Sequence, residues 1–250
     1  YNQAQAMLKD VIENNRFDAR AVFGLYPAQR TGADTVSVFD EAGQKVTHTF
    51  EHLRQQSDKV TGKPNLSLAD FISTSKDNTD YLGGFTVSIF GAEELANEYK
   101  AKGDDYSAIL VQSLADRFAE AFAEHLHERI RKEFWGYKAD ETLGNEELIK
   151  EKYVGIRPAP GYPACPEHSE KAVLFDWLGS EAKIGTKLTE HFAMMPPSSV
   201  SGFYYSHPES EYFNVGKISQ DQLEDYAKRK GWTLDVAKRW LAPNLDDSIV

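Results

Sequence analysis

Apolar residues recur along this chain with two periods, which predict a mixture of helices and strands. The longest periodic stretch runs from Tyr106 to Trp135. Its apolar residues recur every four positions, at Leu110, Leu114, Phe118, Phe122, Leu126 and Ile130. This spacing predicts a long amphipathic helix. The polar face of this helix would carry Asp116, Glu120, Glu124, Arg131 and Lys132.

Strands are predicted where apolar and β-branched residues lie between turn residues. Such runs occupy residues 21–26, 35–39, 45–50, 81–89, 188–194, 200–205 and 212–218. The turn-like segments 31–34 and 41–44 separate the first three runs, which therefore fit an antiparallel meander.

Further helices are predicted at 2–15, 145–152 and 169–178, and two more begin at Gln220 and Leu234. Prolines and a glycine between Gly155 and Pro166 exclude regular structure and predict a shaped loop. Helices and hairpins follow each other without regular alternation, so we expect an α+β fold. The whole chain, 1–250, is expected to form a single domain with a central antiparallel sheet and surrounding helices, including the long amphipathic helix.

Composition narrows the classes of partner. The chain has 39 acidic and 28 basic residues, a net charge of −11 that disfavours nucleic acid. A single cysteine, Cys165, excludes an intrachain disulfide and favours a cytoplasmic protein. No apolar run approaches the roughly 18 to 20 residues that cross a bilayer, so no membrane partner is expected. Glycine signatures for phosphate binding are also missing.

The loop Arg157-Pro-Ala-Pro-Gly-Tyr162 is the best candidate site. A guanidinium on a rigid backbone can pair bidentately with a carboxylate, and Tyr162 adds a ring for stacking. The alternative is a structural turn whose arginine closes a surface ion pair. Aromatic residues at 203–205 and 212–213 could flank a flat ligand, or could be ordinary half-buried strand positions.

Metal and acid–base sites have weaker support. Glu124-x-x-His127 matches half of a di-metal site, but no second half is present and the pair is interpreted as a solvated face. Cys165 and His168 lack the other ligands of a zinc site, so a buried or inert cysteine is favoured. No catalytic triad pattern appears, and no role is assigned to His48, His52, His191 and His207.

At Arg157-Pro-Ala-Pro-Gly-Tyr-Pro-Ala-Cys-Pro-Glu-His168 the chain resembles the C-terminal reactivation domain of cobalamin-dependent methionine synthases. The resemblance covers essentially the whole chain in order. It continues through 52–56, 114–137, 145–149, 200–204, 206–208 and 239–245. Family members have a further N-terminal segment with an Asp that contacts the ligand's amino group, so the resemblance implies that this chain lacks that segment.

The resemblance also implies a set of ligand contacts for S-adenosylmethionine. Arg157 would bind the methionine carboxylate, and Glu120 would lie near the sulfonium cation. The matching positions are Glu120, Arg157, Ala159, Gly161, Tyr162, Tyr212 and Phe213. Where this chain has His191, Met195 and Phe203, relatives carry Ser, Trp and Trp, which predicts a different cleft lining.

The family's reaction implies the function. Inactive cob(II)alamin, held by another module, accepts an electron from a flavodoxin-like donor and is methylated by S-adenosylmethionine. The isolated chain would be a monomeric binding domain of a methyltransferase that positions the methyl donor without turnover alone. One alternative is a regulatory module that senses S-adenosylmethionine without methyl transfer. Another is a metal-dependent hydrolase using Glu124, His127 and His168.

Overall fold

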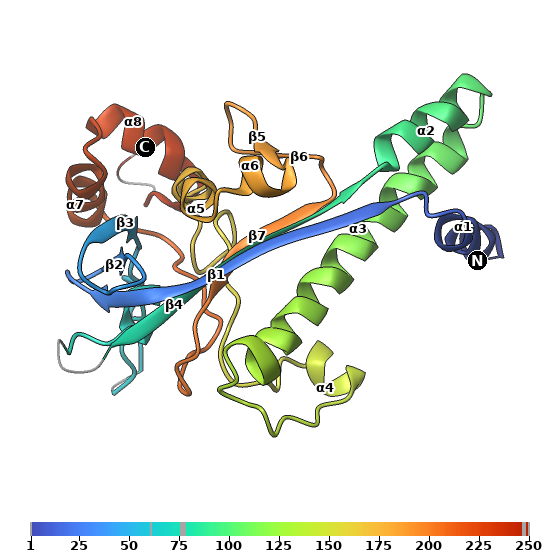
Figure 1. The fold of residues 1–250 in the computed structure, drawn as a ribbon. Coiled ribbons are helices and arrows are strands. Elements are labelled where there is room, and N and C mark those ends of the chain that lie inside the picture. Colours follow the sequence, from blue (N-terminus) through green and yellow to red (C-terminus); the bar gives the residue numbers. More distant parts are fainter. Residues whose placement is uncertain (1, 61, 76–78, 247–248, 250) are drawn as a thin grey trace.

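A five-stranded antiparallel sheet forms the centre of the molecule, in the order β3-β2-β1-β4-β7. The computed structural model describes residues 2–60, 62–75, 79–246 and 249. The strands are β1 (Asp18–Arg30), β2 (Thr35–Phe39), β3 (Val46–Glu51), β4 (Asp80–Phe90) and β7 (Ser199–Tyr204). Helices cover both faces of this sheet (Figure 1), which confirms the predicted α+β fold and the β1–β3 meander.

The two longest strands, β1 and β4, run side by side along the molecule (Figure 1). Their register places Asp18 opposite Phe90 and Ala28 opposite Asp80. The helices α1 (Asn2–Glu13) and α2 (Ala92–Ala101) lie at the end where β1 begins and β4 ends. Both helices pack against the N-terminal half of the long helix, where their apolar side chains form one cluster with it.

The long helix is α3 (Asp105–Arg129), which continues into a π-helical turn, η2 (Ile130–Phe134). It begins where the Asp104 side chain accepts a hydrogen bond of 3.0 Å from the backbone N–H of Ser107. Its fully buried row consists mainly of small residues, namely Ala108, Val111, Ala115, Ala119 and Ala123. The predicted leucines and phenylalanines flank this row and are mostly half-buried. Small residues let the helix axis approach its neighbours closely, and the larger side chains then fill the sides.

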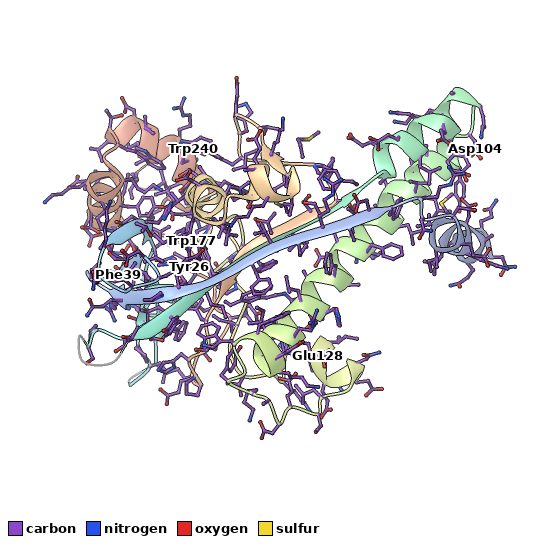
Figure 2. The ribbon with its side chains drawn as sticks, in the orientation of Figure 1. Tyr26, Phe39, Asp104, Glu128, Trp177 and Trp240 are labelled. Carbon is purple, nitrogen blue, oxygen red and sulfur yellow. The ribbon has the colours of Figure 1, made fainter. Side chains whose placement is uncertain are left out.

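The opposite face of the sheet is covered by α5 (Glu170–Leu178) and α6 (Ser180–Ile184). Trp177 of α5 packs against Tyr26 (Figure 2), with ring centroids 5.3 Å apart. Its ring also lies 5.3 Å from that of Phe50. A Cβ at Gly84 of β4 would lie 2.5 Å from the Trp177 ring. The glycine is therefore needed for the indole to lie on the strand.

The C-terminal helix α7 (Gln220–Lys230) packs beside β3 (Figure 1). The next helix, α8 (Leu234–Leu241), packs on α7 and is followed by the 3-10 turn η3 (Ala242–Asn244). Their apolar faces form a separate buried cluster that contains Leu53, Val215, Ile218, Leu223, Tyr226, Ala227, Ala237, Leu241 and Leu245. Both helices confirm the predicted starts at Gln220 and Leu234.

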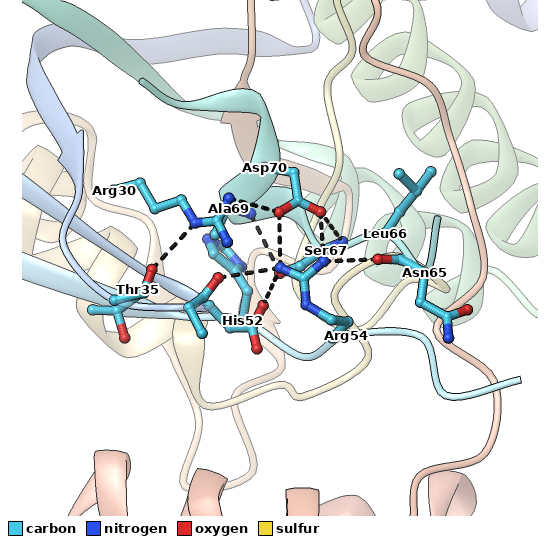
Figure 3. Close-up of polar contacts among 12 residues, drawn as sticks. Arg30, Thr35, His52, Arg54, Asn65, Leu66, Ser67, Ala69 and Asp70 are labelled. Carbon is cyan, nitrogen blue, oxygen red and sulfur yellow. Dashed lines mark hydrogen bonds and ion pairs between the residues drawn. The ribbon is translucent and has the colours of Figure 1, made fainter. Parts of the chain in front are cut away.

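Arg54 holds together the connection between β3 and β4 (Figure 3). Its guanidinium donates to both carboxylate oxygens of Asp70 at 2.7 and 2.8 Å, and to Asp34 at 2.7 Å. Asp70 lies in the 3-10 turn η1 (Leu68–Phe71) and also pairs with Arg30 at 2.8 Å. These bonds fix a long irregular segment against the end of β1, because each charge has a partner of opposite sign.

Two predicted strands are wrong. Of residues 188–194, only the two end residues are in strands, the two-residue β5 (Lys187–Leu188) and β6 (Met194–Met195), and residues 189–193 form the turn between them. Residues 212–218 form no strand, because they pack on the Arg157 loop and the C-terminal helices instead of a sheet edge. Among them, Ile218 makes an isolated bridge to Leu245. The predicted helix at 145–152 is shorter, α4 (Asn145–Ile149).

Arg131, which was predicted to lie on the polar face of the long helix, is instead in the interior. Its side chain is fully buried and donates two hydrogen bonds of 2.7 Å to Glu141. The guanidinium also lies 4.5 Å from the centroid of the Tyr153 ring. This ion pair joins η2 to the segment that leads into the Arg157 loop. Among the described residues, no helix is both long and apolar enough to cross a membrane.

Candidate functional site

A pocket of about 280 Å³ lies where the Arg157 loop meets α3, β4, β7 and the segment around Tyr212. Small-molecule sites typically enclose about 300–1,000 Å³, so this pocket suits a ligand that remains partly exposed. Its lining residues are Phe85, Glu120, Glu151, Arg157, Pro158, Ala159, Tyr162, Pro163, Ala164, Val200, Tyr212 and Phe213. Six of the seven candidate residues from the sequence therefore meet at one cavity.

The loop is held in place by β7. Ile156 and Tyr205 exchange two backbone hydrogen bonds of 3.0 Å, and the Phe203 N–H donates to the Pro158 carbonyl at 2.8 Å. The loop can lie this close because β7 has a glycine at position 202, where a Cβ would be 2.6 Å from the Pro158 oxygen. A strand with a side chain at this position would push the loop away from the pocket.

Gly161 makes the turn that presents Tyr162. Its φ of +96° belongs to the left-handed region that favours glycine, and its N–H donates to the Cys165 carbonyl at 2.7 Å. The His168 ring packs directly over it, since a Cβ at Gly161 would lie 2.4 Å from that ring. Gly161 is the one candidate residue that does not line the pocket, and it shapes the loop from behind.

Arg157 is held at both its backbone and its side chain. Its backbone N–H donates to the Tyr212 hydroxyl at 2.9 Å, and its guanidinium pairs with Glu124 of α3 at 2.7 Å. The same guanidinium nitrogen lies 3.3 Å from Nδ1 of His127. Burial opposes the charge of Arg157, but the Glu124 carboxylate is the main cause that keeps the pKa of Arg157 above its usual value.

Aromatic side chains form the opposite wall. Tyr212 bonds through its hydroxyl to the hydroxyl of Tyr153, 3.0 Å away, and burial raises the pKa of Tyr212. Phe213 packs against Phe71 with ring centroids 6.4 Å apart. Tyr162 is 58% exposed at the pocket mouth. These rings give the pocket a flat, apolar surface that matches an aromatic ligand.

Two carboxylates lie at the rim. Glu120 extends from the exposed side of α3, and Glu151 follows α4 with a φ of +53°. The sequence analysis identified Glu120 but missed Glu151. Nothing in the sequence marks Glu151, because only the fold brings the end of α4 next to the Arg157 loop. With Arg157 paired to Glu124, the rim carries excess negative charge that favours a cationic group on the ligand.

Comparison of the chain with known proteins shows the family to which it belongs. Residues 1–231 match the family described as vitamin B12 dependent methionine synthase, activation domain. The crystal structure of the MetH reactivation domain bound to AdoHcy is similar to this chain, with 51% sequence identity and a TM-score of 0.93. That similarity covers 98% of this chain and 75% of the MetH chain. The chain belongs to the methionine synthase activation domains.

The other candidates from the sequence occupy structural positions in this activation domain. Glu124 and His127 were predicted to form a solvated face, and this prediction is wrong. Both side chains contact the guanidinium of Arg157. Cys165 is buried, as predicted, and burial raises the pKa of its thiol. Within the described residues, no group of three or more His, Cys, Asp or Glu side chains is arranged to hold a metal ion.

The three positions for which the resemblance predicted a different cleft lining do not line the Arg157 pocket, so that prediction is wrong. Phe203 is fully buried against Phe50, with ring centroids 4.9 Å apart. His191 lies in the turn between β5 and β6. Met195 lines a second pocket of about 410 Å³ beside α2, which none of the seven candidate residues reaches.

Proposed function

We propose that this activation domain binds S-adenosylmethionine in the Arg157 pocket and presents its methyl group to cobalamin held by another module. The observation that carries the proposal is the AdoHcy-bound relative, 51% identical over nearly the whole chain. AdoHcy is the product that remains when S-adenosylmethionine gives up its methyl group. The same pocket therefore suits both the donor and the product.

Each part of the ligand has a chemical match in the pocket. Arg157 offers a guanidinium to the methionine carboxylate, a charge-assisted pair with bidentate geometry. The Tyr162, Tyr212 and Phe213 rings offer apolar faces to the nucleoside. Ala159 leaves the backbone of the loop accessible to the ligand, and Gly161 sets the turn that brings Tyr162 to the pocket.

The acidic rim supports the methylated form as the ligand. S-adenosylmethionine carries a sulfonium cation that AdoHcy lacks. Glu120 and Glu151 line the pocket and would attract this cation, which would orient the methyl group that the sulfonium carries.

The chemistry of methyl acceptance would take place on cobalamin, after reduction by one electron from a flavodoxin-like donor. On this proposal the domain supplies orientation and binding, and has no turnover alone. We further propose that it acts as a monomer in the cytoplasm. Its single cysteine, Cys165, is buried and free, which suits a reducing compartment.

Calorimetric titration with AdoHcy tests the proposal. The Arg157→Ala variant should bind roughly 10- to 150-fold more weakly, because a charge-assisted hydrogen bond contributes about 1.5–3 kcal/mol. Arg129→Ala is the matched control, since Arg129 is exposed and pairs with Glu133 at 2.8 Å away from the pocket. Absence of saturable binding by the unaltered chain, or equal affinities for the unaltered chain and Arg157→Ala, would contradict the proposal.

A further inference from the structure

The polar contacts of the Arg157 guanidinium with other side chains of the described residues all go through one nitrogen, NH1. Glu124 Oε2 lies 2.7 Å from NH1, and His127 Nδ1 lies 3.3 Å from it. Both partners come from α3, one helical turn apart on the same face. Neither residue lines the pocket.

The remaining part of the guanidinium is directed to the ligand site. Within the described part of the chain, Nε and NH2 of Arg157 make no hydrogen bond, while the residue itself lines the pocket. A guanidinium presents its donors in a planar fork, so one edge can be held by the protein while another receives a carboxylate.

His127 is suited to hold this arginine because it is neutral. Its side chain is fully buried, stacked on the Tyr204 ring at 5.2 Å and edge-on to Tyr153 at 4.9 Å. Burial, assisted by Arg131 and Arg157, keeps the pKa of His127 well below its usual value. A neutral ring can offer the Nδ1 lone pair to Arg157, whereas an imidazolium would repel it.

We propose that Glu124 is a positioning residue for ligand binding: with His127 it holds NH1 of Arg157 so that the free edge of the guanidinium faces the ligand carboxylate. This inference rests on the proposed function and adds a residue that lies outside the pocket lining. One oxygen of Glu124, Oε1, is buried and has no hydrogen-bond partner among the described residues. The contact that the Glu124 carboxylate makes in this structure is the ion pair of Oε2 with Arg157.

Two ligands separate positioning from a general structural role. AdoHcy carries the carboxylate, and 5′-methylthioadenosine has the same nucleoside without it. In the 250-residue chain, Glu124→Ala should weaken AdoHcy binding roughly five- to twentyfold and leave 5′-methylthioadenosine within about twofold. Glu124→Gln should retain most of the AdoHcy affinity, because its amide oxygen can still accept from NH1. Glu128→Ala, on the same helix and paired with Lys132, is the control.

A double variant provides the second readout. If Glu124 acts through Arg157, Glu124→Ala adds no further loss in the Arg157→Ala background. If Glu124→Ala does not fold, Glu124→Asp is measured instead; its shorter side chain cannot reach NH1 at the same distance, and the same selective loss is expected.

Three results would overturn the proposal: equal losses for both ligands, no loss for AdoHcy, or a loss that adds fully to that of Arg157→Ala. If Arg157→Ala weakens AdoHcy binding while Glu124→Ala does not, only the positioning role fails. If Arg157→Ala itself has no effect, the proposed function fails and the positioning role fails with it.

Discussion

The balance of charge around Arg157 is decided by single residues. One cation lines the pocket, with Glu120 and Glu151 at the rim and Glu124 behind it. Arg157 could be predicted from the composition of its loop, and Glu120 through the family resemblance. Glu124 drew attention there only as half of a metal motif, because its spacing from His127 suits either purpose and the position of Arg157 is not visible in the sequence.

Glu120→Gln tests the effect of the rim charge on selectivity. Removing this carboxylate should lower the ratio of S-adenosylmethionine to AdoHcy affinity about two- to fivefold, since two unit charges 4 Å apart in water interact by about 1 kcal/mol. Competitive titration with both ligands measures the ratio. Glu98→Gln, on α2 away from the pocket, should leave it unchanged. A ratio unaffected by Glu120→Gln would show that the sulfonium does not sense this carboxylate.

At the scale of elements, α3 supports the site by how closely it approaches the sheet. The four-residue periodicity correctly predicted a long helix, yet it emphasised the large residues. The buried row is mostly alanine, and the large residues stand on either side of it. The size of the apolar residues could not reveal which row is buried. The distance between the helix and the sheet also depends on the side chains of the sheet that face it. The strand predictions at 188–194 and 212–218 were wrong for a related reason. Residues with high β propensity form a strand only where the fold leaves a free sheet edge beside them.

Ala119→Leu tests this close approach. Ala119 is 1% exposed, and added methylenes in a packed core typically cost about 1–3 kcal/mol. The free energy of unfolding in urea should fall by this amount. The matched control is Ala121→Leu on the exposed side of the same helix, which should change stability by less than about 0.5 kcal/mol. Equal effects at the two positions would mean that helix propensity, rather than packing, dominates.

At the scale of the whole molecule, the C-terminal helices raise the question of how many domains are present. The family match ends at residue 231, whereas α8 begins at Leu234. The cluster formed by α7 and α8 nevertheless includes Leu53, which precedes the central strands β4 and β7. Val215, only two residues after Phe213 of the pocket wall, belongs to the same cluster. We therefore expect the chain to unfold as one domain.

Leu241→Ala tests that expectation. Leu241 is fully buried, and such truncations cost about 2–5 kcal/mol. Thermal unfolding followed by both circular dichroism and tryptophan fluorescence should show one transition, shifted to lower temperature in both signals. Leu234→Ala, at a position 40% exposed on the same helix, should shift it little. Two separate transitions, with only one of them moved by Leu241→Ala, would instead indicate an independent C-terminal domain.

Local patterns were sufficient to identify the α+β class, the long helix, the meander and the rigid Arg157 loop, because periodicity and proline or glycine content act over a few neighbouring residues. The resemblance carried by the loop extended this to the family. Tertiary structure decided which charged groups became buried partners. Arg131 with Glu141 is a fully buried pair that burial makes necessary, since an unpaired charge in the interior costs several kcal/mol. Glu124 with Arg157 is a partly buried pair beside the pocket. Such pairs depend on distances between segments far apart in the chain, and only the folded molecule sets those distances.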